Sequence, residues 1–304
     1  MQTPVMVVHG RFTRHLRPPE ATPPPLFPGA YGATRTKLEA RQHTWISRCG
    51  FDLPGENARR AQSSIGAGRE QDCRALCFQC EEHHERLFRA ELDQALALKL
   101  PLPTTILWGM FGENVFVGNG SSTDAVASSS TLCVGDILGV IASKKRKRKR
   151  RTVVLEITSP RRPCHKVDAT LGKTPGVRGV RQLCATTGLA GFLCRVVEEG
   201  ELDDGDQLGV ISRPYPQYSL EKVSRLLYGM PGAADTPAYK IPGEGTAMTK
   251  GTGGGRAAVL NAWKGTEAEL RELATLPPLA GYEWRDEFAS LVAALDSERM
   301  CGIQ

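Results

Sequence analysis

The chain has 304 residues, of which 40% are hydrophobic and 24% are charged, values that suit a globular protein with one large domain or two smaller ones. No apolar run approaches the roughly 18 residues that a membrane-spanning helix needs, so we expect no membrane partner. The formal net charge is +6, but the single run Lys144–Arg151 carries eight positive charges, so the rest of the chain is net negative. Nucleic acid is therefore not the expected partner.

The first predicted elements are a strand and a helix separated by loop. Residues 4–9 favour a strand, and residues 52–71 are polar and rich in turn formers, which predicts a loop. Residues 73–99 are rich in helix formers and precede Pro101. This segment is predicted to be a helix, because proline ends helices.

Nine cysteines, an odd number without a secretory signal, indicate free thiols in a reducing compartment, and we expect a cytoplasmic protein. Cys73, Cys77 and Cys80 have the spacing of the iron–sulfur site of radical enzymes, and the last two could start a zinc site with His83. The same positions also lie on one face of the predicted helix. We favour a buried helical stripe, because no alternating barrel of strands and helices surrounds the cluster.

From residue 104 onwards the pattern changes to short apolar strands separated by glycine turns. Such a series predicts a mainly β fold with a closed or nearly closed antiparallel barrel. Residues 135–141 recur at 205–211 with one substitution, which indicates that one strand-entry turn is used twice. The predicted strands are Thr105–Trp108, Asn114–Gly118, Ile137–Ala142, Thr152–Thr158, Phe192–Val197 and Gln207–Ser212.

The basic run Lys144–Arg151 lies between two predicted strands, at a hairpin tip or in an inserted loop. It could serve as a nuclear-import signal, which would make the protein nuclear, or as a phosphate-binding patch. We favour a solvated loop kept extended by its own charge, because no aromatic residues are interleaved to stack on bases.

Cys164 lies in the most distinctive stretch of the sequence. Residues 152–158 alternate as a half-buried strand does, and Pro160 and Pro163 then end the ladder. Positive charge near a thiol favours the thiolate, which is both a nucleophile and a soft metal ligand. A small buried hydrophobic residue is the alternative, and both readings stay open. The titratable neighbours of the thiol are Arg161, Arg162, His165 and Lys166.

The C-terminal part of the chain has a different composition. Residues 229–256 are rich in Gly, Pro and Thr and predict a linker or insertion. The flanking segments 220–228, 267–276 and 282–295 have helical periodicity and suggest a small three-helix unit. We therefore predict a barrel domain at 1–218, interrupted by the basic insertion 144–151, and a helical domain at 219–304.

Four segments resemble, in order and spacing, the successive signatures of the MOSC domain, the molybdenum cofactor sulfurase C-terminal domain family. These segments are Gly112–Val115, Val134–Asp136, Leu155–Lys166 and Thr187–Gly200. The tail is similar to the three-helix domain of bacterial proteins that confer resistance to N-hydroxylated purine bases, at Leu226–Tyr228, Glu269–Ala274 and Glu283–Phe288. The resemblance implies a MOSC-type closed β-barrel with flanking helices, plus a small C-terminal three-helix unit.

The resemblance also implies chemistry: molybdenum cofactor (Mo-molybdopterin), with Cys164 as metal ligand and catalytic residue in an oxidoreductase that reduces small N-hydroxylated substrates. An external electron-donor protein is implied as well, because the chain has no flavin, haem or nicotinamide motif. Pyridoxal phosphate binding is a family-level association only, and a homodimer is left open. The residues implied to bind the cofactor are Arg161, Arg162, Lys166, Arg195, Glu113 and Asn114.

Some of these assignments have alternatives. Arg195 could be an outward strand residue, and the turn at Glu113 and Asn114 a structural strand entry. Residues 66–72 depart from the family pattern because they lack its histidine, and Arg35 or Lys37 stands where the family has a lysine. A second hypothesis is a non-catalytic carrier of molybdenum cofactor, or of sulfur as a Cys164 persulfide. A third is a nucleic-acid protein built on the basic run.

Overall fold

The structure is a computed structural model that describes ten parts of the chain. The described residues are 5–13, 38–39, 45–51, 75–87, 89, 112–120, 126–143, 151–163, 180–228 and 265–302. The predicted strand at 105–108, the predicted loop at 52–71 and the linker at 229–256 lie outside them. Within the described parts, no helix is both long enough and apolar enough to cross a membrane.

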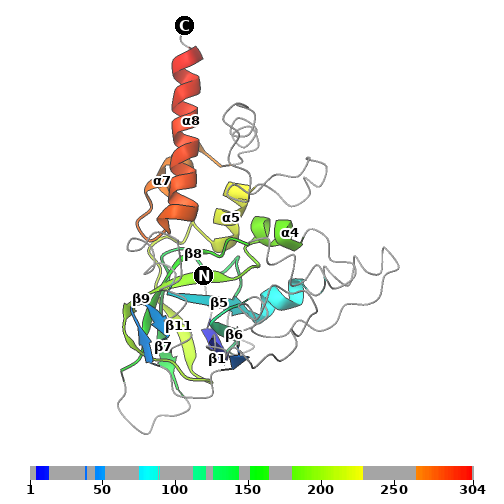
Figure 1. Cartoon of the computed structure of the whole chain (residues 1–304), viewed down its shortest axis with the longest axis vertical. Helices are drawn as coiled ribbons and strands as arrows, with labels where there is room; N and C mark the ends of the chain where they lie inside the picture. Colours follow the sequence, from blue (N-terminus) through cyan, green and yellow to red (C-terminus); the bar gives the residue numbers. More distant parts are fainter. Residues whose placement is uncertain are drawn as a thin grey trace, which may run out of the picture.

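Most strands form a closed β-barrel at one end of the molecule (Figure 1). Around the barrel they follow the order β11-β7-β8-β9-β5-β6-β1, and β1 pairs back to β11, which confirms the predicted closure. These pairs are antiparallel except β5 with β6. The barrel strands are β1 (Val5–Thr13), β5 (Leu76–Cys80), β6 (Val115–Asn119), β7 (Ile137–Ala142), β8 (Val154–Pro160), β9 (Phe192–Glu198) and β11 (Gln207–Ser212).

Short strands are added outside the barrel. One of them, β2 (Leu38–Glu39), pairs with the end of β1. A separate sheet has the order β10-β3-β4, and its strands are β3 (Trp45–Ser47), β4 (Gly50–Phe51) and β10 (Gly200–Glu201). Ile46 and Phe51 of this sheet are buried, so it contributes to the hydrophobic core.

Two equivalent turns lead into the neighbouring strands β7 and β11. Before β7, Asp136 Oδ2 accepts the Cys133 N–H at 2.9 Å, and before β11, Asp206 Oδ2 accepts the Asp203 N–H at 2.8 Å. The glycine before each aspartate has φ of 83° and 84°, in the left-handed region that glycine tolerates best. The repeat in the sequence is therefore one strand-entry turn used twice, as predicted.

Residues 76–80 form strand β5, so the helix predicted from residue 73 is wrong over this segment. Among the described residues, the backbone becomes helical at Glu81, and residues 81–87 and 89 are helical. All five residues of β5 are buried, because the strand lies between β6 and β9 and both its faces are covered. Apart from Gln79 the strand is an apolar run, and periodicity alone cannot distinguish such a run from a buried helical segment.

Strand β8 is also more buried than the half-buried strand that the sequence predicts. Leu155 and Ile157 point into the core as expected, but Glu156 and Thr158 on the other face are buried as well. The C-terminal part of the chain covers this face, since the Ala280 N–H donates to the Thr158 carbonyl at 3.1 Å. Pro160 ends the strand, as predicted.

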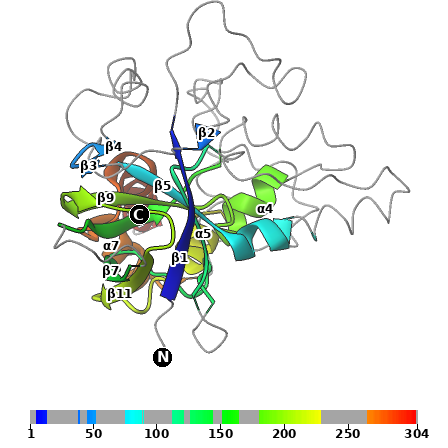
Figure 2. The same cartoon turned by 90° about the horizontal axis from the view of Figure 1, so that it is seen from below.

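Helices cover one side of the barrel and continue beyond it. Figure 1 shows α7 and α8 at the opposite end of the molecule from most of the strands, with the C-terminus at the tip of α8, and Figure 2 shows α4 on the flank away from β7 and β11. Buried residues of α5, α7 and α8 continue the barrel core. These elements are α4 (Val180–Thr187), α5 (Leu220–Tyr228), α7 (Glu267–Thr275), the π-helix η2 (Gly281–Arg285) and α8 (Asp286–Gly302).

Specific contacts hold the predicted C-terminal helices together. Tyr228 of α5 and Trp284 of η2 have ring centroids 5.8 Å apart in an edge-to-face arrangement. Lys222 Nζ of α5 lies 2.6 Å from Glu269 of α7. Thr266 and Glu269 form a capping box that starts α7. The mainly β fold class with a C-terminal helical unit is confirmed, while the domain boundary at residue 218 stays a prediction.

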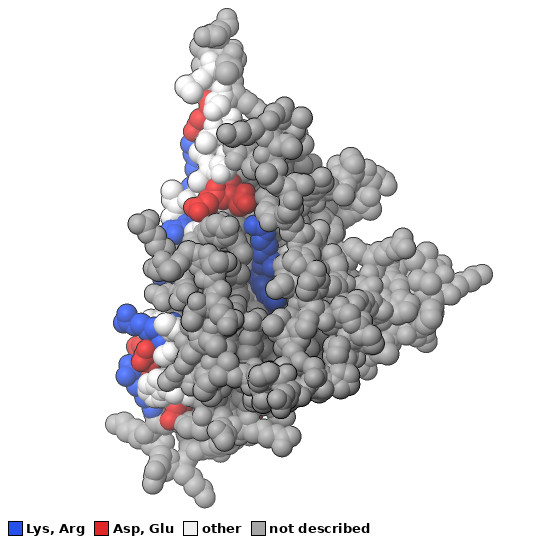
Figure 3. All heavy atoms as spheres, viewed as in Figure 1, with Lys and Arg blue, Asp and Glu red and all other residues white. Residues whose placement is uncertain are grey.

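The basic run lies in the connection between β7 and β8, which are antiparallel neighbours. Residues 144–150 are outside the described parts, and the described Arg151 is exposed. Over the described part of the face in Figure 3, Lys and Arg atoms lie beside Asp and Glu atoms and do not form one continuous basic surface. This distribution agrees with the net negative charge of the remaining sequence.

Candidate functional site

The described part of the candidate site is the loop that leaves β8. Pro160 pairs with Phe192 at the start of β9, and the Arg161 N–H donates to the Gly191 carbonyl at 2.8 Å. Pro163 is buried at the end of the described segment. The candidate metal ligand Cys164 and the neighbouring Lys166 lie outside the described residues, so their roles stay predictions.

Arg162 connects this loop to the C-terminal helices. Its Nη1 lies 3.8 Å from Glu287 Oε1 of α8, and its side chain is only 14% exposed. Because Glu287 is not adjacent in sequence, this ion pair draws the β8 loop toward α8. Arg162 was predicted to bind the cofactor, and the structure gives its guanidinium a protein partner.

The loop also contains polar groups that could contact a ligand. The Ser159 hydroxyl is fully buried at the end of β8 and has no hydrogen-bond partner among the described residues. Arg161 follows two residues later with a partly buried side chain. A hydroxyl and a guanidinium at one strand end suit an anionic group such as a phosphate, because both can donate hydrogen bonds to it.

A glycine turn packs directly against this loop. The Gly191 N–H donates to the Gly188 carbonyl at 3.3 Å, and both glycines have positive φ, 98° and 73°. A Cβ at Gly191 would lie 2.2 Å from the Phe78 carbonyl oxygen, closer than any real contact. Only glycine therefore allows the turn to approach strand β5 so closely.

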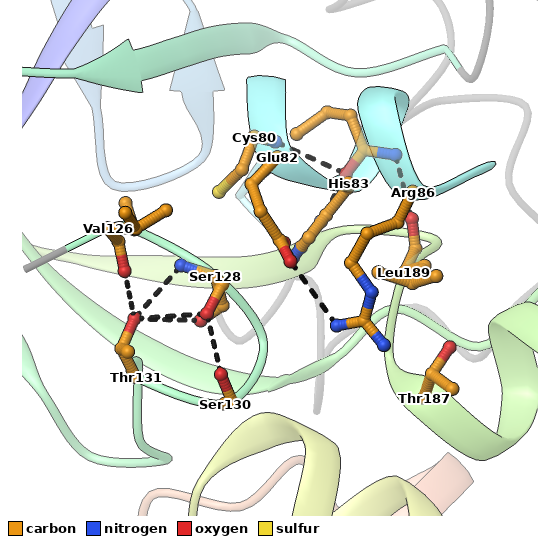
Figure 4. Close-up of polar contacts among 12 residues, drawn as sticks. Cys80, Glu82, His83, Arg86, Val126, Ser128, Ser130, Thr131, Thr187 and Leu189 are labelled. Carbon is orange, nitrogen blue, oxygen red and sulfur yellow. Dashed lines mark hydrogen bonds and ion pairs between the residues drawn. The ribbon is translucent and has the colours of Figure 1, made fainter. Parts of the chain in front are cut away.

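Beneath the turn, Gln79 and His83 form a fully buried polar pair. His83 Nδ1 lies 2.7 Å from Gln79 Oε1, and Gln79 Nε2 donates to the Leu189 carbonyl at 2.9 Å. His83 and Leu189 are labelled in Figure 4. Burial lowers the pKa of His83 to about 3, so the ring is neutral near pH 7. Its hydrogen bonds are then those of one fixed tautomer.

Glu82 lies next to this pair on the same helix. Its carboxylate points toward Arg86 in Figure 4, with Oε1 3.3 Å from Arg86 Nη1, and Oε2 lies 3.9 Å from His83 Nε2. Burial raises the pKa of Glu82, although Arg86 opposes the shift. The helix that follows β5 therefore brings titratable groups under the turn that supports the candidate loop.

Glu113 and Asn114 lie at the entry to β6, separated from β8 by β9 and β5 in the barrel. Asn114 is joined to Cys77 by two hydrogen bonds: its Oδ1 accepts the Cys77 N–H at 3.0 Å, and its own N–H donates to the Cys77 carbonyl at 2.6 Å. Glu113 is fully buried. These contacts support a structural strand entry for Asn114, and the cofactor-binding roles of both residues stay predictions.

Arg195 forms an ion pair with a residue of the neighbouring barrel strand. It lies opposite Glu156 in the β8–β9 ladder, and the two side chains form an ion pair. The Arg195 side chain is 37% exposed. This contact is what the alternative of an outward strand residue predicts, and it gives the guanidinium a partner other than a cofactor.

The metal-site alternatives for the first cysteine cluster do not fit the described residues. Cys77 and Cys80 are three residues apart on strand β5, so their side chains point to opposite faces. The described residues contain no group of three or more His, Cys, Asp or Glu side chains able to hold a metal ion. Cys73 lies outside them. Cys80 is instead a buried core residue, and burial raises the pKa of its thiol.

The sequence alone did not reveal two of the supporting residues. Gln79 gives no local signal, because its partner Leu189 is 110 residues away. Glu287 reaches Arg162 from another part of the chain. His83 was singled out by its proximity to the cysteines, but as a zinc ligand and not as the partner of Gln79.

Fold and loop together define a class: a closed β-barrel protein whose candidate site lies where one barrel strand ends against a glycine turn. The family follows from the sequence, since residues 66–209 match the model of the MOSC domain. The chain therefore contains a MOSC domain at residues 66–209, as its motifs predicted.

Comparison with other proteins agrees with this assignment. A protein named Reductase from Gibberella moniliformis is 31% identical over 127 residues, which span 42% of this chain and 19% of that protein. The uncharacterized protein YflK of Bacillus subtilis is 30% identical over 118 residues, 39% of this chain and 44% of that protein. The alignments thus cover less than half of either relative.

The crystal structure of YiiM from Geobacillus stearothermophilus has a TM-score of 0.52 and 17% identity to this chain. The alignment covers 94% of this chain and 99% of that chain, so it includes the C-terminal helices as well as the barrel. At this identity the likeness shows the fold alone.

Proposed function

We propose that the chain binds molybdenum cofactor at the loop that follows β8 and reduces small N-hydroxylated compounds. The observation that carries the proposal is the position of this loop inside the MOSC domain, where it is held on one side by Gly191 and on the other by Glu287. The family is associated with this cofactor, and a relative that covers part of the chain is named a reductase. A loop fixed on both sides can present a ligand with little loss of conformational entropy.

The loop carries cationic side chains that suit the phosphate of this cofactor and a thiol that suits its metal. Arg161 and Lys166 would hold its phosphate, and the buried Ser159 hydroxyl offers a further donor. Cys164 would supply a thiolate, the type of ligand that soft metals prefer. Arg162, because it is paired with Glu287, would contribute by fixing the loop. The bound cofactor would supply the two-electron redox chemistry, and an external protein the electrons.

The first test is molybdenum and pterin analysis of protein purified from a host that makes the cofactor. Wild type is compared with Cys164→Ala and with a matched control, Cys133→Ala. Cys133 is a buried cysteine in the turn before β7, outside the β8 loop. We expect near-stoichiometric molybdenum in wild type and control, and its loss in Cys164→Ala.

Activity is tested next, with N-hydroxylated bases as substrates and a reduced viologen dye as electron donor. Turnover by wild type that is absent in Cys164→Ala would support the reductase. Bound molybdenum and pterin without turnover of any N-hydroxylated base would favour the non-catalytic carrier. Wild-type protein that lacks both molybdenum and pterin would refute the proposed function.

A further inference from the structure

A chain of hydrogen bonds links the helix after β5 to the loop after β8. It starts at His83, a fully buried residue whose Nδ1 lies 2.7 Å from Gln79 Oε1. An amide oxygen only accepts hydrogen bonds, so the ring proton is on Nδ1. Gln79 Oε1 also lies 3.3 Å from the Cys80 N–H, so two donors fix the orientation of this amide.

The amide orientation decides what Gln79 does at its other end. With Oε1 occupied by two donors, Nε2 must face the Leu189 carbonyl, to which it donates at 2.9 Å. Leu189 lies within the turn between Gly188 and Gly191, which is closed by a backbone hydrogen bond of 3.3 Å. Gln79 thus fixes the turn 188–191 through a hydrogen bond to its backbone.

The turn 188–191 is hydrogen-bonded to the candidate loop. The Gly191 carbonyl accepts the Arg161 N–H at 2.8 Å, three residues before Cys164 in the sequence. A Cβ at Gly191 would meet Gln79 Oε1 at 3.1 Å as well as the Phe78 carbonyl oxygen, so the turn rests directly on both residues. A displacement of Gln79 would therefore be passed on to Arg161 through contacts that leave little free space.

We propose that Gln79 and His83 are positioning residues for the cofactor loop: His83 orients the Gln79 amide, Gln79 fixes the turn 188–191, and the turn sets the position of Arg161, where the loop begins. The proposal rests on the proposed function for its link to the cofactor. The hydrogen-bond chain itself can be tested without any cofactor.

The test uses variants of the full-length chain that remove one contact at a time. Gln79→Leu removes both ends of the link, and His83→Leu removes only the donor that orients the amide. His83→Asn keeps an N–H donor at about the same distance from the backbone as Nδ1, so it should rescue the function of the link. Val8→Ala is the matched control, because it destabilises the barrel core on β1, away from the loop.

The first readout is amide hydrogen exchange in cofactor-free protein, resolved to the peptide that contains Arg161. Loss of one buried hydrogen bond should raise the exchange rate of the Arg161 peptide by about tenfold in Gln79→Leu and His83→Leu. The alkylation rate of Cys164 by iodoacetamide, measured on the same samples by mass spectrometry, should change in these two variants. Both readouts should stay close to wild type in His83→Asn and in Val8→Ala.

The second readout is molybdenum and pterin content after expression in a cofactor-producing host. We expect a severalfold loss in Gln79→Leu and His83→Leu that His83→Asn restores. Unchanged exchange at Arg161 in a folded Gln79→Leu variant, with normal cofactor content, would overturn the positioning role alone. Wild-type protein without molybdenum and pterin would overturn the proposed function and the link to the cofactor, whatever the exchange data show.

Discussion

Replacing Asp136 by asparagine should destabilise the barrel through the loss of its ion pair, while the turn before β7 stays closed. Asp136 is fully buried and receives two hydrogen bonds from Arg213, at 2.8 Å on Oδ1 and 2.7 Å on Oδ2. Its Oδ2 also accepts the Cys133 N–H, a bond that an asparagine oxygen can still make. In the variant, the amide nitrogen would replace Oδ1 and face the Arg213 Nε–H, donor against donor, and Nη2 would keep only a neutral acceptor in place of the carboxylate.

The expected cost follows from the burial of the pair. Breaking a fully buried ion pair costs about 3–5 kcal/mol. The Arg213 side chain keeps 15% exposure and a hydrogen bond to the Thr131 carbonyl at 2.9 Å, so part of its charge remains solvated. We therefore expect a loss of about 2–3 kcal/mol in the free energy of unfolding, or a fall in Tm of about 4–9 °C for a chain of this size.

The assay is a double-mutant cycle measured by urea denaturation. The four proteins are wild type, Asp136→Asn, Arg213→Gln and the double variant. The change in the free energy of unfolding of the double variant, minus the sum of the changes in the two single variants, is the coupling energy between the two side chains. We expect a coupling of about 2 kcal/mol. A coupling near zero, with Asp136→Asn as stable as wild type, would refute the view that this pair stabilises the fold.

Three further predictions concern other parts of the chain. Gly191→Ala should cost about 3 kcal/mol or more in thermal denaturation, since its φ is positive and a Cβ would lie 2.2 Å from the Phe78 oxygen. In alkylation at pH 7, Cys164 should react before Cys133, because burial raises the pKa of Cys133 to about 11; equal rates would contradict this. The hydrogen bond from Lys222 lowers the pKa of Glu269 in the folded protein. The ionised Glu269 therefore stabilises the fold above pH 4.5, and this stabilisation is lost as the pH falls through the lowered pKa of the folded state. Glu269→Gln should therefore be less stable by about 1 kcal/mol at pH 7 in urea titration, a difference that shrinks at pH 3.

Elements whose sequence pattern depends on one exposed face were predicted well. The bounds of β7, β11 and α5 agree with the predicted segments 137–142, 207–212 and 220–228. Each has a polar or glycine-rich boundary and a side that faces solvent, so the alternation or the helical period is visible in the sequence. The same pattern disappears in β5, which is covered on both faces.

The candidate loop could be located from the sequence, but its supports could not. The prolines and cations from Pro160 to Lys166 stand together in the chain, and the end of β8 at Pro160 agrees with the prediction. The partners of the loop come from residues 79–83, 188–191 and 287, which only the closed barrel and the helices behind it bring together. Hydrogen bonds between such distant segments leave no periodic signal, so the structure was needed to find them.

The pairing of β1 with β11 affects how the protein folds during synthesis and where its chain can be truncated. Val5 lies opposite Gly209, so the barrel stays open until more than 200 residues have left the ribosome. Contacts of such long sequence separation slow folding and leave strand edges free to pair with other chains in the meantime. A fragment cut at the limits of the MOSC match, residues 66–209, would lack β1 and half of β11. Expression of a soluble barrel should therefore require both the first strand and the last one, with chaperone demand highest for chains arrested between them.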